Sequence, residues 1–166
     1  MSEIISKMSS YNIFNYLFSG IIFIVLSKFF LDIEIYIKLD NGDIIVNLFW
    51  AYFIGLTISR IGSLIIEPIF KGFIETKDYS EFVKAEKINP KISILSEQNN
   101  VYRTLTSLFF VILLLFFIKF GFQYNLKLFI IIFLCVIYSL SYLKQTRYIV
   151  KRIDSVLKKG DSNGSS

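Results

Sequence analysis

The fold is decided by residues 105–143, which begin at Leu105, end at Leu143 and read LTSLFFVILLLFFIKFGFQYNLKLFIIIFLCVIYSLSYL. The only charged residues in this stretch are Lys119 and Lys127, and they flank a polar turn at residues 121–125. The hydrocarbon core of a bilayer is about 30 Å thick, so a helix needs roughly 20 apolar residues to cross it. The stretch therefore predicts two transmembrane helices, at residues 105–122 and 128–143, that form a tight helical hairpin.

Two further apolar runs lie upstream, at residues 13–31 and 44–66. None of the four runs alternates apolar and polar residues, as the strands of an outer-membrane barrel do. Only 19% of the residues are charged, whereas soluble domains carry about 25%. The first run is too long for a cleaved signal peptide, and no small-residue cleavage site follows it. We therefore predict an all-α polytopic membrane protein with four transmembrane helices and a short helical cytoplasmic cap.

The segments between the apolar runs also carry helix signals. Asp78 and Glu81 have the spacing of a capping box, Pro90 ends the short helix that follows, and the helix that begins at Lys91 is expected to continue into the third span. The predicted parts are an N-terminal transmembrane helix pair (1–66), a cytoplasmic helical segment (67–104), a C-terminal transmembrane hairpin (105–143), a cytoplasmic amphipathic stalk (144–159) and a disordered tail or linker (160–166).

Lysine and arginine residues are distributed unequally between the segments that flank the spans. The N-terminus, the middle segment and the tail together carry thirteen, whereas the first loop and the flanks of the hairpin turn carry three. Positively charged residues concentrate on the cytoplasmic side of a membrane. Both termini and the middle segment are therefore expected in the cytoplasm.

The composition argues against most enzyme classes. The chain has no histidine, and its single cysteine, Cys135, lies in the fourth apolar run. Serine–histidine and cysteine–histidine pairs cannot form without histidine, and a zinc site needs several histidine or cysteine ligands. We find no glycine-rich phosphate loop either. We therefore expect a protein that is not an enzyme and that needs no metal or cofactor.

Polar residues near the ends of the second and third runs are candidates for a pore or a gate. Arg60 lies inside the second run, and Glu67 follows seven residues later, on the same face of a regular helix. Arg60 either reaches the cytoplasmic interface or pairs with Glu67 for stability, or it lines a cavity or ion path, because a charge facing lipid is costly. We expect both residues to join a polar network with Asn99, Asn100, Tyr102 and Arg103.

Small residues recur every four positions in the second run, at Gly55, Ser59 and Ser63. Such a face lets two helix backbones approach closely. It serves either packing inside one subunit or a contact between subunits. Together with the small cap, it leads us to predict a symmetric homo-oligomer, with a tetramer favoured.

Basic residues of the cap and the stalk are candidates for ligand binding. Cations interleaved with aromatic side chains suit a single-stranded oligonucleotide. The alternative is that they only follow the topology and contact anionic lipid. The candidates are Lys84, Lys87, Lys91, Arg147, Lys151 and Arg152.

Four short motifs together support a resemblance to a known family. They are RIGSLIIEP at residues 60–68, Tyr79-x-x-Phe82-x-x-Ala85, Pro90-Lys91-Ile92 and LSEQNNVYRT at residues 95–104. Over residues 11–143 the chain resembles small four-span proteins of bacterial anti-phage defence loci, in particular the channel-like membrane effector of the Hailong system, which is encoded beside a nucleotidyltransferase.

The resemblance implies an oligomeric pore in the bacterial inner membrane. An oligonucleotide, the product of the nucleotidyltransferase, would keep the pore shut, and infection would open it and depolarise the membrane. An oligomer would be required, since four spans are too few to enclose a wide pore. The residues alone leave open a second function, that of a non-conducting membrane anchor or scaffold that recruits a soluble partner.

Overall fold

The structure is a computed structural model that describes residues 2–33, 44–122 and 125–163, with the side chains of 10–33, 44–122 and 125–159. In the described part of the chain, every regular element is helical. Four stretches are long and apolar enough to cross a membrane, which confirms an all-α, multi-pass architecture. The elements are α1 (Ser2–Leu31), α2 (Ile44–Ile61), a π-helical turn (Gly62–Ile66), α3 (Glu67–Lys71), α4 (Tyr79–Ile88), α5 (Lys91–Phe120) and α6 (Leu126–Asn163).

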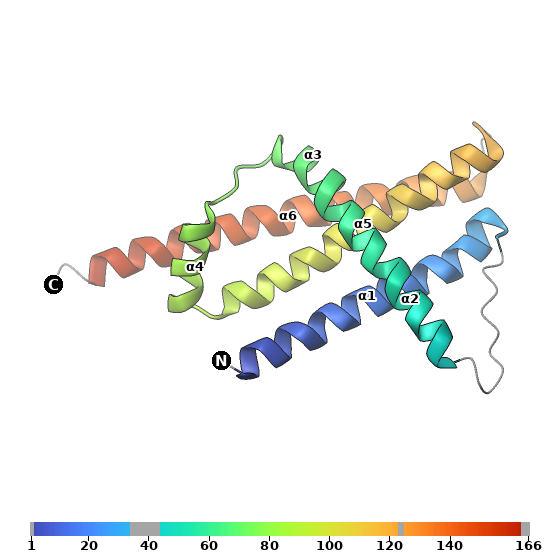
Figure 1. Ribbon diagram of the computed structural model, residues 1–166. Coiled ribbons are helices and arrows are strands. Elements are labelled where there is room, and N and C mark those ends of the chain that lie inside the picture. The colour runs from blue at the N-terminus through green and yellow to red at the C-terminus, as the bar shows by residue number, and fades with distance from the viewer. Residues whose placement is uncertain (1, 34–43, 123–124, 164–166) are drawn as a thin grey trace.

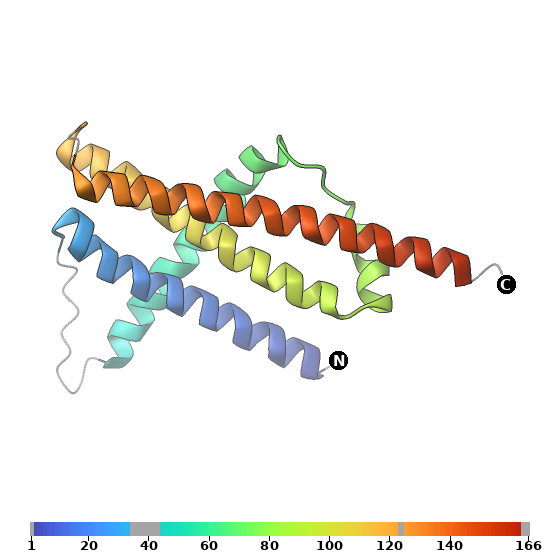
Figure 2. The same ribbon diagram turned by 180° about the vertical axis from the view of Figure 1, so that it is seen from behind.

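Helix α5 lies at the centre of the bundle. It runs between α1 and α6, and α2 crosses the bundle at a steep angle (Figure 1, Figure 2). The most apolar window of α5 is 44% buried, against 17% for that of α6, so α5 is the helix that the others cover. The main core cluster consists of Phe30, Leu31, Ile58, Leu108, Phe109, Ile112, Phe116, Leu128 and Ile131.

The two ends of the molecule differ in character. The start of α1, helix α4 and the end of α6 lie toward one end, here named the cap end, and the turn between α5 and α6 lies toward the other (Figure 1, Figure 2). This arrangement agrees with the predicted grouping of the termini with the middle segment. The predicted loop between the first two spans falls mostly on residues 34–43, outside the described residues.

Helices α1 and α2 touch backbone to backbone. A Cβ atom added at Gly55 would lie 1.7 Å from the carbonyl oxygen of Tyr16, and one added at Gly20 would lie 1.7 Å from that of Ala51. Ser59 is buried on the same side of α2, next to Thr104 of α5. Gly55 and Ser59 thus pack inside one chain, and they no longer argue for a contact between subunits.

The cap has a small core of its own. Helix α4 packs on α5 and α6 through a cluster of Ala85, Ile92, Ile149, Ile153 and Val156. The predicted capping box is confirmed: the backbone N–H of Asp78 donates to the Glu81 carboxylate at 3.3 Å, and α4 begins one residue after Asp78. Just before α4, the Lys77 ammonium donates to the Asp154 carboxylate of α6 (2.7 Å), and this hydrogen bond raises the pKa of Lys77.

Three predicted segment boundaries fall inside continuous helices. Helix α5 runs through residues 104 and 105, and α6 runs through residues 143 and 144, because the sequence offers neither proline nor glycine there to end a helix. Helix α6 also continues to Asn163, into the segment predicted as a disordered tail or linker, and residues 164–166 lie outside the described residues.

Candidate functional site

The helix that follows α2 changes its winding just before a proline. In a regular α-helix the carbonyl of Leu64 would accept a hydrogen bond from residue 68, but Pro68 has no N–H and its ring crowds that carbonyl. The chain instead forms a π-helical turn at Gly62–Ile66, in which the N–H of Glu67 donates to the carbonyl of Gly62, five residues back. A π turn holds one extra residue, so it rotates everything beyond it by about 100° relative to a regular helix.

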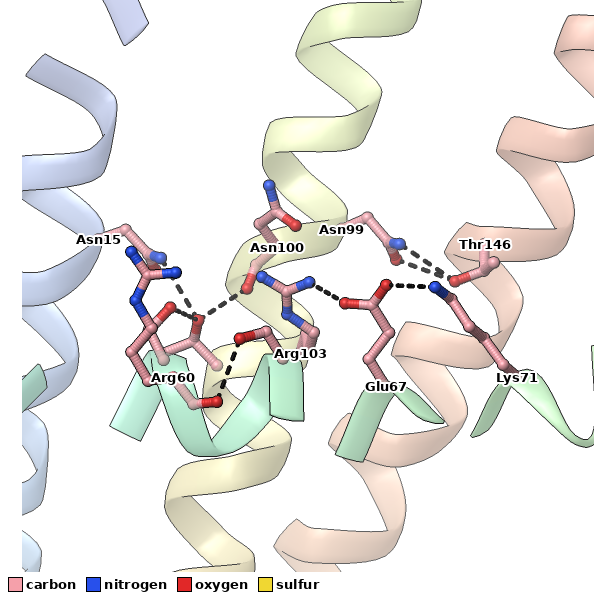
Figure 3. Close-up of polar contacts among 11 residues, drawn as sticks. Asn15, Arg60, Glu67, Lys71, Asn99, Asn100, Arg103 and Thr146 are labelled. Carbon is pink, nitrogen blue, oxygen red and sulfur yellow. Dashed lines mark hydrogen bonds and ion pairs between the residues drawn. The ribbon is translucent and has the colours of Figure 1, made fainter. Parts of the chain in front are cut away.

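This rotation separates Arg60 from Glu67, which the sequence placed on one helix face. Glu67 points to α5 and pairs with Arg103, and it also pairs with Lys71 of its own helix at 3.0 Å. The Arg60 side chain is exposed, and no carboxylate pairs with it in the described part of the chain. In the view of Figure 3, Arg103 lies between Arg60 and Glu67. The predicted network therefore includes Glu67 and Arg103 but not Arg60.

The Glu67–Arg103 pair is largely removed from solvent. The exposed fractions of the two side chains are 23% and 17%. The Nε atom of Arg103 is buried without a hydrogen-bond partner among the described residues. Arg103 thus depends on Glu67 as its carboxylate partner, whereas Glu67 has a second cation in Lys71. Since a buried charge without a partner is costly, the pair fixes α3 against α5.

A second polar cluster, centred on Thr104 directly after Arg103, ties α1, α2 and α5 together. Asn15 of α1 donates to the hydroxyl of Thr104, which also lies 2.8 Å from the carbonyl of Asn100 and 3.4 Å from the hydroxyl of Ser59. Asn15 and Thr104 are both buried. Neither residue is among the predicted pore or gate candidates, although Thr104 ends the polar motif at residues 95–104.

The start of α5 is also joined to α6. The side chains of Asn99 and Thr146 hydrogen bond to each other, at 3.1 and 3.3 Å (Figure 3). Nothing in the sequence singled out Thr146. The predicted site residue Tyr102 is half-buried, and its carbonyl accepts a hydrogen bond from Thr106 at 2.9 Å. Ser63, the third of the small residues that recur every four positions after Gly55, donates to the carbonyl of Arg60 (3.1 Å).

A cavity of about 230 Å³ opens beside these contacts, between α3, α5 and α6. Helix α3 forms one wall, and the connection that follows it forms another. The lining includes both partners of the Lys71–Glu67 pair as well as Lys77, so its charged groups have partners inside the chain. The lining residues are Glu67, Phe70, Lys71, Ile74, Thr76, Lys77, Asn99, Tyr142 and Thr146.

The six basic residues predicted to bind a ligand do not converge on one pocket. Five of them, Lys84, Lys87, Lys91, Arg147 and Lys151, are exposed on α4, α5 and α6. Arg152 lines a cavity of about 240 Å³ between the end of α4 and α6. The cap end therefore presents a dispersed basic surface.

The site carries fixed charges and polar contacts. Among the described residues no group of histidine, cysteine, aspartate and glutamate side chains is arranged to hold a metal ion. The arrangement can hold helix ends together and present charge at the cap end. Comparison of the chain with protein-family models, with curated proteins and with solved structures finds no match.

Proposed function

We propose that this chain is the subunit of a homo-oligomeric ion channel in a bacterial inner membrane, with a tetramer favoured. The channel acts as an effector of an anti-phage, abortive-infection system and depolarises the membrane when it opens. Its cap end and both termini are in the cytoplasm, and a nucleotide or oligonucleotide, the product of a partner nucleotidyltransferase, gates it there. The motif resemblance and the basic bias of the cap end support this assignment.

The single observation that carries the channel proposal is the position of Arg60. Its guanidinium is exposed on the surface of a membrane-spanning stretch, and no carboxylate of the described chain pairs with it. An unpaired charge that faces lipid costs several kcal/mol, and such residues face protein or a water-filled cavity instead. A pore between subunits provides that water, and it places one Arg60 from each subunit around the same axis.

The packed interior of one subunit indicates that a pore would form between subunits. The bundle centre is filled by the cluster around Leu108, Ile112 and Phe116, all three fully buried. The two cavities described above both lie at the cap end. Conduction therefore requires several subunits, whose exposed apolar faces meet lipid or one another.

The cap end suits control of such a pore. Glu67, Lys71 and Arg103 fix the end of the second span to the start of the third, beside the cavity and the basic surface. A ligand changes the open fraction of a channel only if it binds one state better than the other. A ligand at the cap end can do so because it contacts the helix ends that the pore movement would displace.

The experiment that tests this proposal measures the ion selectivity of Arg60 variants. Rings of arginine or lysine favour anions, so the wild-type reversal potential in a potassium chloride gradient is expected on the chloride side. Arg60→Ala should shift it toward the potassium side, and Arg60→Lys should keep the wild-type sign. Arg147→Ala, which removes an exposed arginine from α6, is the matched control and should leave the reversal potential unchanged.

Two outcomes decide against the proposal. If Arg60→Ala and Arg147→Ala behave alike, Arg60 does not line the pore. If none of the proteins conducts, the protein is better described as a membrane anchor that recruits a soluble partner. Tyr79 of α4 is 82% exposed and Phe73 before it is 73% exposed, and these side chains would then be the first to test for partner binding.

A further inference from the structure

We propose that the π-helical turn at Gly62–Ile66 is a register switch for α3. In the described state the turn holds Glu67 against Arg103. In the other state the turn becomes a regular α-helix, which rotates α3 by about 100° and carries Glu67 onto the face of α2 that bears Arg60. The switch itself does not depend on conduction, and only its role in gating rests on the proposed function.

Two local features of the turn determine how readily its winding can change. Pro68 removes the donor that a regular helix would need at this point, which favours the π turn. The outer side of the turn is largely exposed in the described chain, since Leu64 is 74% exposed and Ile65 is 48% exposed, whereas Gly62 and Ile66 on its inner side are buried. A change of winding therefore meets no packed neighbour on that side.

The segment beyond the turn is short, and few contacts join it to the other helices. Helix α3 has five residues, and the connection at residues 72–78 contains no helix or strand. Two contacts hold α3 in the described orientation: the pairing of Glu67 with Arg103, and the edge contact of the Phe70 and Tyr142 rings, whose centroids are 5.8 Å apart. Rotation breaks both of them. The pairing of Glu67 with Lys71 lies inside α3 and is kept, because the two residues move together.

The rotated state offers Glu67 a different positive charge. Seven residues of regular helix turn through nearly two complete revolutions, so Glu67 would share the face of Arg60. Arg60 has no carboxylate partner in the described state, whereas Arg103 would lose one in the rotated state. The switch thus transfers one negative charge from the interior of the subunit to the face that we assign to the pore.

The cavity at the cap end is coupled to the same movement. Glu67, Phe70 and Lys71 form its α3 wall, and rotation would remove this wall. A molecule that fills the cavity would therefore bind the π state better and oppose the rotation.

Two variants should shift the orientation of α3 in opposite directions. Pro68→Ala restores the missing N–H donor and should favour the regular helix. Deletion of Leu64 removes the extra residue, so a regular helix then carries Glu67 in its described orientation and the π state is no longer needed. Leu64→Ala is the matched control, because it changes the same exposed side chain without changing the register.

The readout is thiol cross-linking between Phe70→Cys and Tyr142→Cys in a Cys135→Ser background. A short bifunctional reagent should join the two cysteines in the described orientation and miss them after rotation. The comparison is made in an Arg103→Ala background, where no buried arginine opposes the rotation. There we expect Pro68→Ala to lower the cross-linking rate by up to about fivefold, the change in equilibrium that one backbone hydrogen bond supports. Deleting Leu64 in the Pro68→Ala protein should restore the rate, and Leu64→Ala should not.

The outcomes separate the switch from the proposed function. An unchanged cross-linking rate in Pro68→Ala overturns the switch, whatever the protein conducts. A reduced rate that the Leu64 deletion does not restore also overturns it, since the proline would then act by distorting α3. If the rates change as expected but no variant conducts ions, the switch stands and the channel proposal fails.

Discussion

Replacing Glu67 with alanine is expected to lower the free energy of unfolding by about 3 kcal/mol, because it leaves Arg103 buried without a carboxylate. The reverse replacement, Arg103→Ala, should cost less, about 1 kcal/mol. Glu67 would keep Lys71 as a partner, at 3.0 Å and at a half-exposed position. The effects of the two single replacements are therefore expected to be unequal, although they remove the same ion pair.

Denaturant titration in mixed micelles measures this difference. The double variant Glu67→Ala/Arg103→Ala should lie closer to Arg103→Ala than to the sum of the two single effects, since it strands no charge. Arg147→Ala serves as the exposed arginine control and should change stability by less than about 0.5 kcal/mol. Equal losses for Glu67→Ala and Arg103→Ala would contradict the proposed dependence of Arg103 on Glu67.

The second large effect is expected at the crossing of α1 and α2. Gly55→Ala places a methyl group where the carbonyl oxygen of Tyr16 already lies, at 1.7 Å. The obstacle is backbone, which cannot move aside as a flexible side chain would, so the helices must separate and lose their contact. We expect a loss of about 3 kcal/mol or more, at the upper end of overpacking effects.

A matched glycine replacement is available for comparison. At Gly72 a new Cβ would meet only the carbonyl oxygen of Ile69, at 3.4 Å, and the residue is exposed. Gly72→Ala should therefore change stability by less than about 0.5 kcal/mol. Thermal unfolding in detergent, followed by circular dichroism, compares the two variants directly. A Gly55→Ala protein as stable as Gly72→Ala would show that the helices do not cross at this point.

The sequence predicted those parts of the fold that depend on local patterns. The length of each apolar run determines whether it spans a membrane, and this property needs no knowledge of neighbours. The capping box at Asp78 and Glu81 is a contact within one turn, and the structure contains it. The continuation of α5 from Lys91 into the third span followed from the absence of any helix breaker.

The site was harder to predict because it depends on register. The expectation that Arg60 and Glu67 share a face assumed 3.6 residues in every turn. Pro68 was visible in the sequence, but whether a helix accommodates a proline by a kink, by ending or by a π turn depends on what packs around it. Here the buried partner is Arg103, which lies 36 positions further along the chain. The pairing of Glu67 with Arg103 instead of Arg60 is therefore a consequence of tertiary packing.

The row of small residues on α2 shows a similar limit of prediction from sequence. The spacing of Gly55 and Ser59 indicates that some backbone comes close, but it does not say which one. The structure places α1 there, through Gly20 and Tyr16. Thr146 and Tyr142 could not be found from spacing, since both belong to an otherwise ordinary amphipathic pattern and gain their role only through contact with Asn99 and Phe70.

The measurement that tests the central claim most directly is chloride flux from liposomes that contain only the purified protein. Wild-type protein that has been purified free of oligonucleotide is expected to release chloride. Pro68→Ala is measured in parallel, because the wild type would stay closed if the π turn keeps the pore shut. The predicted result is chloride flux from the wild type or from Pro68→Ala. Adding Arg60→Ala should reduce this flux, and adding Arg147→Ala should leave it unchanged. Liposomes that hold folded protein and retain their chloride in both cases would contradict the claim that this chain forms a channel.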